Sequence, residues 1–262
     1  MSIPGLTVMD LLALKGQRQL AYVQVTCDEE VEAADEAGKD MIGTAFIPER
    51  AHLAGLAKNT HFQFGLPWGP HASADEALRT AMAAMKAGAQ SVYCGMSPAV
   101  VEVLSREGVP VICHIGLVPP KATWTGGYKA VGRTLEQARK LLDQVRDFEN
   151  AGAFAVEMEV IPAELAAAIT QRTSMLTISL GSGGGCDVQY LFSADLLGEN
   201  RGHIPRHAKS YRNFAAERDR MQAERVAAYR EYIADVASGA FPAQENVVSI
   251  SDETLARVIE DR

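Results

Sequence analysis

Two residues in this sequence carry side chains suited to proton transfer and lie at the ends of predicted buried strands. His114 follows the apolar segment that starts at Val109, and Glu159 lies near the end of segment 153–160. An imidazole and a carboxylate facing one site can act as general acid and base, because burial and mutual interaction tune their pKa values. The alternative is a structural histidine and a glutamate paired with a cation at the rim.

A regular alternation of short apolar strands and helices positions these residues. Strands are predicted at 20–26, 41–45, 61–66, 90–94, 109–113, 153–160 and 175–180, and a strand or short helix at 188–197. Helices are predicted between most strands; that at 73–88 begins with a capping pattern, Ser73 and Glu76. Alternation of this kind predicts a parallel sheet. About eight such units in 262 residues predict a closed (β/α)8 TIM barrel, with an open doubly wound sheet as the alternative.

We expect one barrel domain over residues 1–262 with a C-terminal helical extension, because no linker or low-complexity segment divides the chain. The extension contains a long charged helix at 213–238 and a terminal helix at 251–261. The charged helix is predicted to present a solvated face and contacts between subunits.

The composition restricts the partners of the protein. A formal net charge of -8 argues against nucleic acid and anionic membranes, which need a basic surface. No apolar run reaches the length of a membrane-spanning helix, and residues 1–20 lack the pattern of a signal peptide. The four cysteines form no CxxC pair. We therefore expect a cytoplasmic protein with reduced thiols that acts on a small molecule.

In a barrel, the C-terminal ends of all strands meet at one mouth. Besides His114 and Glu159, the predicted substrate-binding residues at this mouth are Thr44, Ala45, Gly65, Tyr93, Cys94, Ser182 and Gly183. The glycine loop 181–185 can offer backbone N–H groups to an anion, or it can be a plain tight turn. Cys27, His61, Cys94 and Cys113 also lie near strand ends. These four residues lack the paired spacing of a zinc site. We therefore expect the cysteines to be buried free thiols rather than metal ligands.

The segment CHIGLVPPKATWTGGYKAVGR, residues 113–133, resembles the signature of the ketopantoate hydroxymethyltransferase family, GH-[IL]-G-L-T-P-Q followed by GGY-[KR]-x-QGR. Segment 156–166, VEMEVIPAELA, is similar to the LE-x-[VI]-P-x-ELA of that family. Segments 178–186, 202–208 and 238–242 also resemble family sequences in order and spacing. The resemblance extends from about residue 8 to about residue 245.

This resemblance implies a (β/α)8 barrel related to phosphoenolpyruvate mutase and isocitrate lyase. It implies an enzyme that transfers a hydroxymethyl group from methylenetetrahydrofolate to a 2-oxo acid, ketoisovalerate, which is chelated by Mg²⁺. Members usually form decamers, so a homo-oligomer is implied. By the same resemblance, Glu159 matches the glutamate that handles the proton at the enolising carbon, and His114 matches a strand-end histidine.

The sequence departs from the family at the metal site. The family has aspartate ligands where this chain has Thr44 and Gly65, and segment 92–95 carries Tyr93 and Gly95 where the family has lysine and glutamate. Since Mg²⁺ needs hard oxygen ligands, usually carboxylates, we expect no family-type Mg²⁺ site and no metal ligands. The same changes free volume and add aromatic surface, which suits a bulkier or more apolar ligand.

Three hypotheses follow for the function. The first is a family-like enzyme that makes or breaks a carbon–carbon bond next to a carbonyl, with an altered substrate and no family Mg²⁺; Glu159 is its acid–base and His114 and Tyr93 polarise the carbonyl. The second is a genuine 3-methyl-2-oxobutanoate hydroxymethyltransferase with relocated ligands, such as Asp28, Glu157 or a cysteine. The third is a non-catalytic, ligand-binding homologue.

Overall fold

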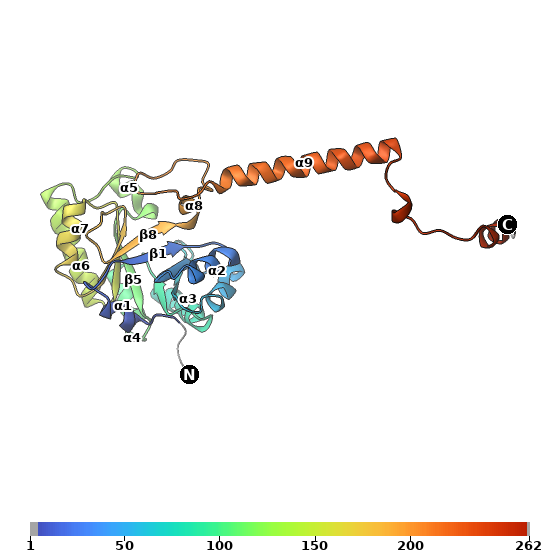
Figure 1. Cartoon of the computed structure of the whole chain (residues 1–262). Coiled ribbons are helices and arrows are strands. Elements are labelled where there is room, and N and C mark those ends of the chain that lie inside the picture. The colour runs from blue at the N-terminus through green and yellow to red at the C-terminus, as the bar shows by residue number, and fades with distance from the viewer. Residues whose placement is uncertain (1–4, 261–262) are drawn as a thin grey trace. The chain divides into compact units, whose positions relative to one another are not determined.

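Eight parallel strands close into a barrel in the computed structural model, which describes residues 5–260 (Figure 1). The strands follow one another around the barrel in chain order. They are β1 Leu20–Gln24, β2 Met41–Ala45, β3 His61–Gly65, β4 Ser91–Tyr93, β5 Val111–Gly116, β6 Ala155–Glu159, β7 Leu176–Leu180 and β8 Val188–Phe192. The predicted (β/α)8 fold is confirmed, and the open-sheet alternative is wrong.

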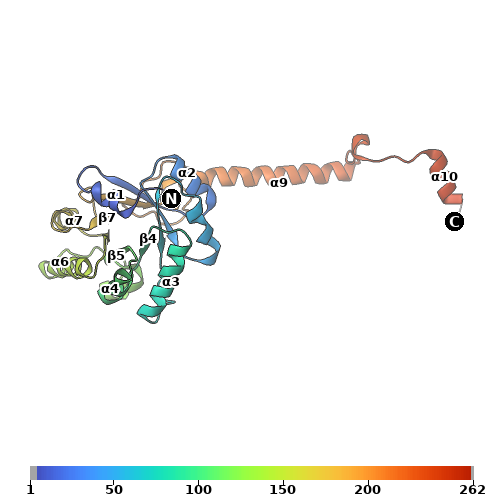
Figure 2. The same ribbon diagram turned by 90° about the horizontal axis from the view of Figure 1, so that it is seen from below.

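Helices cover the outside of the barrel, and Figure 2 shows several of them arranged around the strands. They are α1 Val8–Ala13, α2 Asp28–Glu36, α3 Ala74–Lys86, α4 Pro98–Arg106, α6 Leu135–Asn150 and α7 Ala163–Thr170. Side-chain caps begin two of them: the hydroxyl of Ser73, as predicted, and that of Thr134 accept hydrogen bonds from the N–H groups of Glu76 and Gln137. Each cap satisfies a backbone donor that the first helical turn leaves free.

The segment around β5 differs from the prediction. The strand starts at Val111 because Pro110 has no N–H for the ladder, and it continues to Gly116. His114 is therefore inside the strand rather than at its end. The loop that follows contains a 3₁₀ turn, η2 Pro119–Lys121, and a short helix, α5 Ala122–Thr125.

Two other regions left open by the sequence also form regular structure. Within 46–60 the chain forms a 3₁₀ helix, η1 Pro48–Gly55. Segment 188–197 contains both of the predicted alternatives, because β8 is followed directly by the short helix α8 Ser193–Leu196.

The barrel interior is apolar at one end and polar at the other. Leu20, Met41, Ile112, Leu176 and Val188 form its apolar floor and are at most 2% exposed. Further along the same strands, the buried residues become tyrosine, glutamine, histidine and glutamate. Burying polar groups costs free energy unless they are paired, so this polar layer marks the functional end of the barrel.

The chain divides into two compact units, residues 1–212 and 213–262. The first holds the barrel. The second holds α9 Phe214–Ser238, η3 Gln244–Asn246 and α10 Asp252–Glu260. The predicted helices at 213–238 and 251–261 are present, although residue 261 lies outside the described residues. Within residues 5–260, no helix combines the length and apolar character needed to cross a bilayer.

Candidate active site

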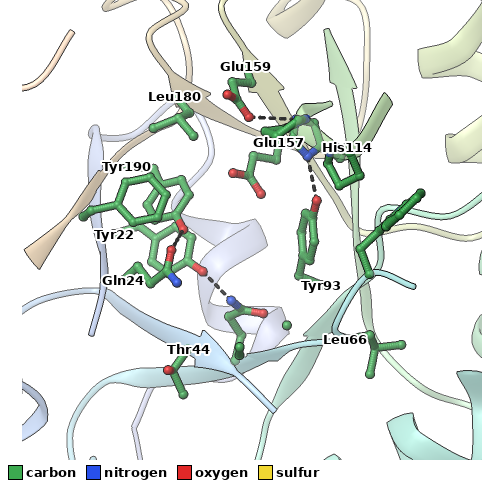
Figure 3. A pocket seen from close by; sticks show the side chains of 17 residues that line it. Tyr22, Gln24, Thr44, Leu66, Tyr93, His114, Glu157, Glu159, Leu180 and Tyr190 are labelled. Carbon is green, nitrogen blue, oxygen red and sulfur yellow. Dashed lines mark hydrogen bonds and ion pairs between the residues drawn. The ribbon is translucent and has the colours of Figure 1, made fainter. Parts of the chain in front are cut away.

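A cavity of about 270 Å³ opens at the C-terminal end of the barrel, and all eight strands contribute to it (Figure 3). Its lining residues are Tyr22, Gln24, Thr44, Ala45, Gln63, Gly65, Leu66, Trp68, Tyr93, His114, Pro119, Pro120, Glu157, Glu159, Leu180, Tyr190 and Phe192. The cavity can hold a small molecule, which would contact two glutamates and a histidine.

Both glutamates come from β6. Side chains two residues apart on a strand point to the same face, so Glu157 and Glu159 both face the barrel interior. Val156 and Met158 face the other way and belong to the core between strands and helices. Figure 3 shows both glutamates at the cavity, with Glu159 beside His114.

His114 connects Glu159 with Tyr93. Its Nε2 lies 3.4 Å from Oε2 of Glu159, and its Nδ1 is hydrogen-bonded to the Tyr93 hydroxyl at 2.7 Å. The first contact has the distance of an ion pair but not the geometry of a hydrogen bond, so Nε2 has no hydrogen-bond partner in the described structure. A buried ring nitrogen in this state is available to a substrate oxygen.

The pKa values of His114 and Glu157 are both raised, for different reasons. Burial by itself lowers the pKa of His114, but the Glu159 contact and the charges of both glutamates outweigh it, so the pKa rises. Burial raises the pKa of Glu157 to about 7, with a further rise from the charge of Glu159 and an opposing effect from His114. Near neutral pH, Glu157 is therefore partly a carboxylic acid that can donate a proton or a hydrogen bond.

Neutral polar groups from β1, β3 and β8 complete the interior. Tyr22 stacks on Tyr190 with ring centroids 4.1 Å apart, and the Tyr190 hydroxyl donates to Gln24 Oε1 at 2.8 Å. Gln63 Nε2 donates to the Tyr22 hydroxyl, while Gln63 Oε1 is buried without a partner. A Cβ at Gly43 would overlap both Tyr22 and Gln63, so only glycine allows this pair to meet. Burial raises the pKa of both tyrosines, which keeps them as neutral donors.

The chain leaves β6 through a strained residue. Val160, directly after Glu159, has φ of 50°, which a β-branched residue rarely adopts. Hydrogen bonds hold it in place: its N–H donates to the Leu180 carbonyl at 2.9 Å, and its carbonyl accepts from the Val131 N–H at 3.1 Å. These two hydrogen bonds fix the backbone where the chain leaves β6, directly after Glu159.

The predicted site residues fall into two groups. Glu159, His114, Thr44, Ala45, Gly65 and Tyr93 line the cavity. Cys94 is buried beside Tyr93 and lines an adjoining cavity instead. Ser182 lies behind β6, where its hydroxyl donates to the Met158 carbonyl and accepts from the Ile161 N–H. Gly183 packs against Ala163, where a Cβ would come within 2.6 Å. Ser182 and Gly183 therefore support the strand end rather than line the cavity.

Sequence reasoning missed the site role of several interior residues. Glu157 is among the strand-end candidates and the possible relocated metal ligands but is assigned no catalytic role from the sequence, although its spacing of two from Glu159 places it on the same face. Tyr22, Gln24, Gln63 and Tyr190 were not singled out; polar side chains within apolar strands were the available signal. Asp28, the other proposed relocated ligand, is exposed and contacts His52 at 2.8 Å.

The donor set of the cavity does not fit a family-type Mg²⁺ site. At the two family aspartate positions, Thr44 accepts a hydrogen bond from Arg50 at 3.3 Å, and Gly65 has no side chain. Across residues 5–260, no three histidine, cysteine, aspartate or glutamate side chains are arranged to hold a metal ion. Two of the residues considered for zinc are engaged elsewhere: His61 is hydrogen-bonded to the Leu6 carbonyl and Ser91, and Cys113 donates to the Ala155 carbonyl.

The sequence matches a known family over most of its length. Residues 37–244 match the model described as "Ketopantoate hydroxymethyltransferase". A 3-methyl-2-oxobutanoate hydroxymethyltransferase from Deinococcus radiodurans is 39% identical over 208 residues, covering 77% of this chain and 71% of that protein. The protein of the same name from Nitrosomonas eutropha is 39% identical over 203 residues, covering 75% and 73%.

A solved structure supports the fold. The 2,3-dimethylmalate lyase, described as a member of the PEP mutase/isocitrate lyase superfamily, has a TM-score of 0.50 at 13% identity and covers 98% of this chain and 95% of its own. At that identity the likeness concerns the barrel fold alone. The family match carries more weight, because it extends over the strands that supply His114 and Glu159. The chain therefore belongs to the ketopantoate hydroxymethyltransferase family.

Proposed function

We propose that this protein is an enzyme that makes or breaks a carbon–carbon bond next to a carbonyl, through an enolate that its own side chains stabilise without the family Mg²⁺. The supporting observation is the cluster of Glu157, Glu159, His114 and Tyr93 within one cavity. It combines a carboxylate base, a carboxylic acid with a pKa of about 7 and an imidazole whose Nε2 makes no hydrogen bond and lies 3.4 Å from Glu159.

In the proposed reaction, the Glu159 carboxylate removes a proton from the carbon next to the carbonyl and becomes a carboxylic acid. The electron pair of the C–H bond moves to the carbonyl oxygen, which becomes the enolate oxygen. Protonated Glu157 and the His114 ring donate hydrogen bonds to that oxygen. The enolate carbon then forms a C–C bond to the carbon of a one-carbon aldehyde, whose π electrons move to its oxygen; that oxygen takes the proton from Glu159 as the substrate carbonyl re-forms. In the opposite direction, Glu159 takes this hydroxyl proton, the C–C bond breaks to release the aldehyde, and Glu159 returns the proton to the enolate carbon.

The free energies by which such donors stabilise an enolate are compatible with their replacing a metal ion. A Lewis-acidic metal contributes several kcal/mol of charge stabilisation to an enolate. One preorganised donor to an oxyanion contributes about 3 kcal/mol in a site that excludes water. Two such donors, from Glu157 and His114, therefore reach the same range. The aromatic rings of Tyr93, Tyr190 and Phe192 help to exclude water from the cavity.

The proposal includes an altered substrate, since the cavity lacks the family's aspartates and lysine. Methylenetetrahydrofolate as the one-carbon donor and assembly into a homo-oligomer are expectations from the family that belong to the same proposal.

A second candidate is a genuine 3-methyl-2-oxobutanoate hydroxymethyltransferase in which Glu157 is a relocated metal ligand. The names of the relatives favour it, as does the presence of two carboxylates in one cavity. This candidate requires about one equivalent of bound Mg²⁺ in the purified protein and its loss in Glu157→Gln. Metal analysis of both proteins would therefore separate the two candidates.

The test of the proposed function is solvent deuterium exchange at the carbon next to a carbonyl, followed by NMR. The probes are ketoisovalerate and a set of simple ketones and oxo acids. We expect exchange with at least one probe, and its loss in Glu159→Gln while the melting temperature stays unchanged. If no probe exchanges in the wild-type protein, or if Glu159→Gln exchanges as fast as the wild type, the proposal is wrong.

A further inference from the structure

A second cavity adjoins the reacting one. Its volume is about 470 Å³, and it shares Leu66, Trp68, Tyr93 and Pro120 with the first cavity. These shared residues form a boundary between the two cavities that is aromatic and apolar. The two cavities therefore meet at Tyr93 and its neighbours, and the second is larger than the reacting cavity.

The two cavities differ in charge. Among the residues that line the reacting cavity, the ionisable groups besides tyrosine are Glu157, Glu159 and His114, and neither lysine nor arginine is among them. Arg50 reaches the Thr44 hydroxyl from outside the lining. A carboxylate attached directly to the reacting carbonyl would thus lie near the carboxylate of Glu159, with His114 as the one basic side chain among the lining residues. The arrangement favours a neutral carbonyl at the reacting end.

Lys121 supplies the positive charge of the second cavity and is the one lysine or arginine that lines it. It belongs to η2, and its Nζ donates to the Gly95 carbonyl at 3.1 Å, just after β4. An ammonium group has three donors, so this contact leaves donors for an anion. The other titratable nitrogen there, His71 Nε2, is already hydrogen-bonded to Thr80.

Gly95 lines the second cavity close to the Tyr93 hydroxyl. A Cβ at this position would come within 2.9 Å of the Tyr93 hydroxyl, the group that binds His114. Glycine therefore keeps the Tyr93–His114 contact intact while leaving space next to Lys121. The same short segment serves the reacting cavity on one side and the second cavity on the other.

We propose that the substrate is a ketone or aldehyde whose reacting carbonyl is neutral and whose remote arm ends in a carboxylate bound by Lys121. This inference rests on the proposed function for the identity of the reacting end. The proposed substrates are oxo acids in which several carbons separate the carbonyl from the carboxylate, rather than 2-oxo acids.

Isomeric probes test this proposal directly by NMR titration of the wild-type protein. 5-Oxohexanoate and 2-oxohexanoate have the same atoms and charge and differ in where the carbonyl lies; 2-hexanone lacks the carboxylate. The seven- and eight-carbon homologues cover longer arms. For at least one chain length, we expect the oxo acid with the carbonyl far from the carboxylate to bind about tenfold more tightly than its 2-oxo isomer and than the matching neutral ketone. A tenfold gain corresponds to one charge-assisted hydrogen bond, here from Lys121 to the carboxylate.

Substitutions in the loop after β5 test whether Lys121 causes the binding preference. Lys121→Gln should remove the tenfold preference and leave the binding of the neutral ketone unchanged, whereas Lys121→Arg should keep most of it. Lys129→Gln is the matched control, because Lys129 is on the same loop but does not line the second cavity. A preference that survives in Lys121→Gln, or tighter binding of the 2-oxo isomers by the wild type, would overturn the proposal.

Binding and exchange separate this inference from the proposed function. Deuterium exchange without the binding preference would reject the role of Lys121 and leave the function standing. The preference without exchange on any probe would support the Lys121 subsite and reject the enolising chemistry.

Discussion

The two ends of the barrel each bury a histidine, and the two behave in opposite ways. His61, at the start of β3, is 0% exposed, and both ring nitrogens have protein partners, the Leu6 carbonyl and the Ser91 hydroxyl. Burial lowers its pKa to about 4. His114, on β5, is 6% exposed, contacts Glu159 and Tyr93, and has a pKa raised by the contact with Glu159 and the charges of Glu157 and Glu159. Burial alone therefore makes a structural histidine, and neighbouring carboxylates make a chemical one.

The largest expected effect concerns Glu159 at the reactive end. Glu159→Gln should reduce deuterium exchange by about 10³-fold, because the amide cannot accept the proton. It should also lower the pKa of His114, since the main opposing contact to desolvation is lost. The pKa is read from the ring-proton shifts of His114 in an NMR titration. An unchanged His114 pKa would contradict the difference drawn between the two histidines.

Glu157 should make the protein less stable as pH rises. Its folded pKa is raised from 4.5 to about 7, so the unfolded chain loses the proton first and stability falls between pH 4.5 and 7. The shift corresponds to a loss on the order of 3 kcal/mol. Glu157→Gln should remove this loss, so the variant gains stability over the wild type at pH 8 relative to pH 4.5. Urea unfolding at both pH values measures it.

The Glu157 variant should also lose activity. Its amide N–H still donates to the enolate oxygen but is a weaker donor than a carboxylic acid, so we expect about a tenfold slower exchange. Glu157→Leu removes the donor and should cost about 10²-fold. Equal rates in the wild type and Glu157→Leu would remove Glu157 from the mechanism.

His61 should have the opposite pH dependence. Its folded pKa is lowered from 6.5 to about 4, so its contribution to stability is complete above pH 6.5 and is lost as pH falls toward 4. The magnitude is again on the order of 3 kcal/mol, nearly cancelling the Glu157 effect in the wild type. His61→Gln should remove this pH dependence of stability between pH 4 and 6.5, and its deuterium exchange rate should stay within about twofold of the wild-type rate. A large loss of exchange rate in folded His61→Gln would show that the far end of the barrel also takes part in the chemistry.

The smallest effect on stability is expected for Tyr93. Tyr93→Phe removes the hydrogen bond to His114 Nδ1 without changing the ring, so orientation and tautomer of the imidazole are less fixed. We expect about a tenfold slower exchange and a stability change of about 1 kcal/mol. Exchange kinetics and thermal melts of the two proteins would check both values. If the variant matched the wild type in rate, Tyr93 would be only a wall of the cavity.

Much of the barrel was predictable because strand and helix patterns are local. The sequence predicted the bounds of β2 without error and placed the C-terminal end of β7 at Leu180. It also predicted His114 and Glu159 at the mouth. The directions of side chains were harder to predict. Ser182 follows β7 at the predicted mouth, but its hydroxyl donates to the Met158 carbonyl of β6 and does not line the cavity.

The stacked pair of Tyr22 and Tyr190 could not be predicted from local sequence patterns, for a different reason. Tyr22 and Tyr190 are partners only because barrel closure brings β1 and β8 into register. A pattern read along the chain does not contain that pairing. Glu157 was within reach, since alternation along β6 places it beside Glu159.

The metal dependence of exchange tests the central claim most directly. Wild-type protein is treated with EDTA, and exchange on the best probe is measured before and after adding excess Mg²⁺. A chain that stabilises the enolate with Glu157 and His114 should exchange at the same rate in both samples, within about twofold. Exchange that is abolished by EDTA and restored by Mg²⁺ would contradict the account and identify the enzyme as metal-dependent.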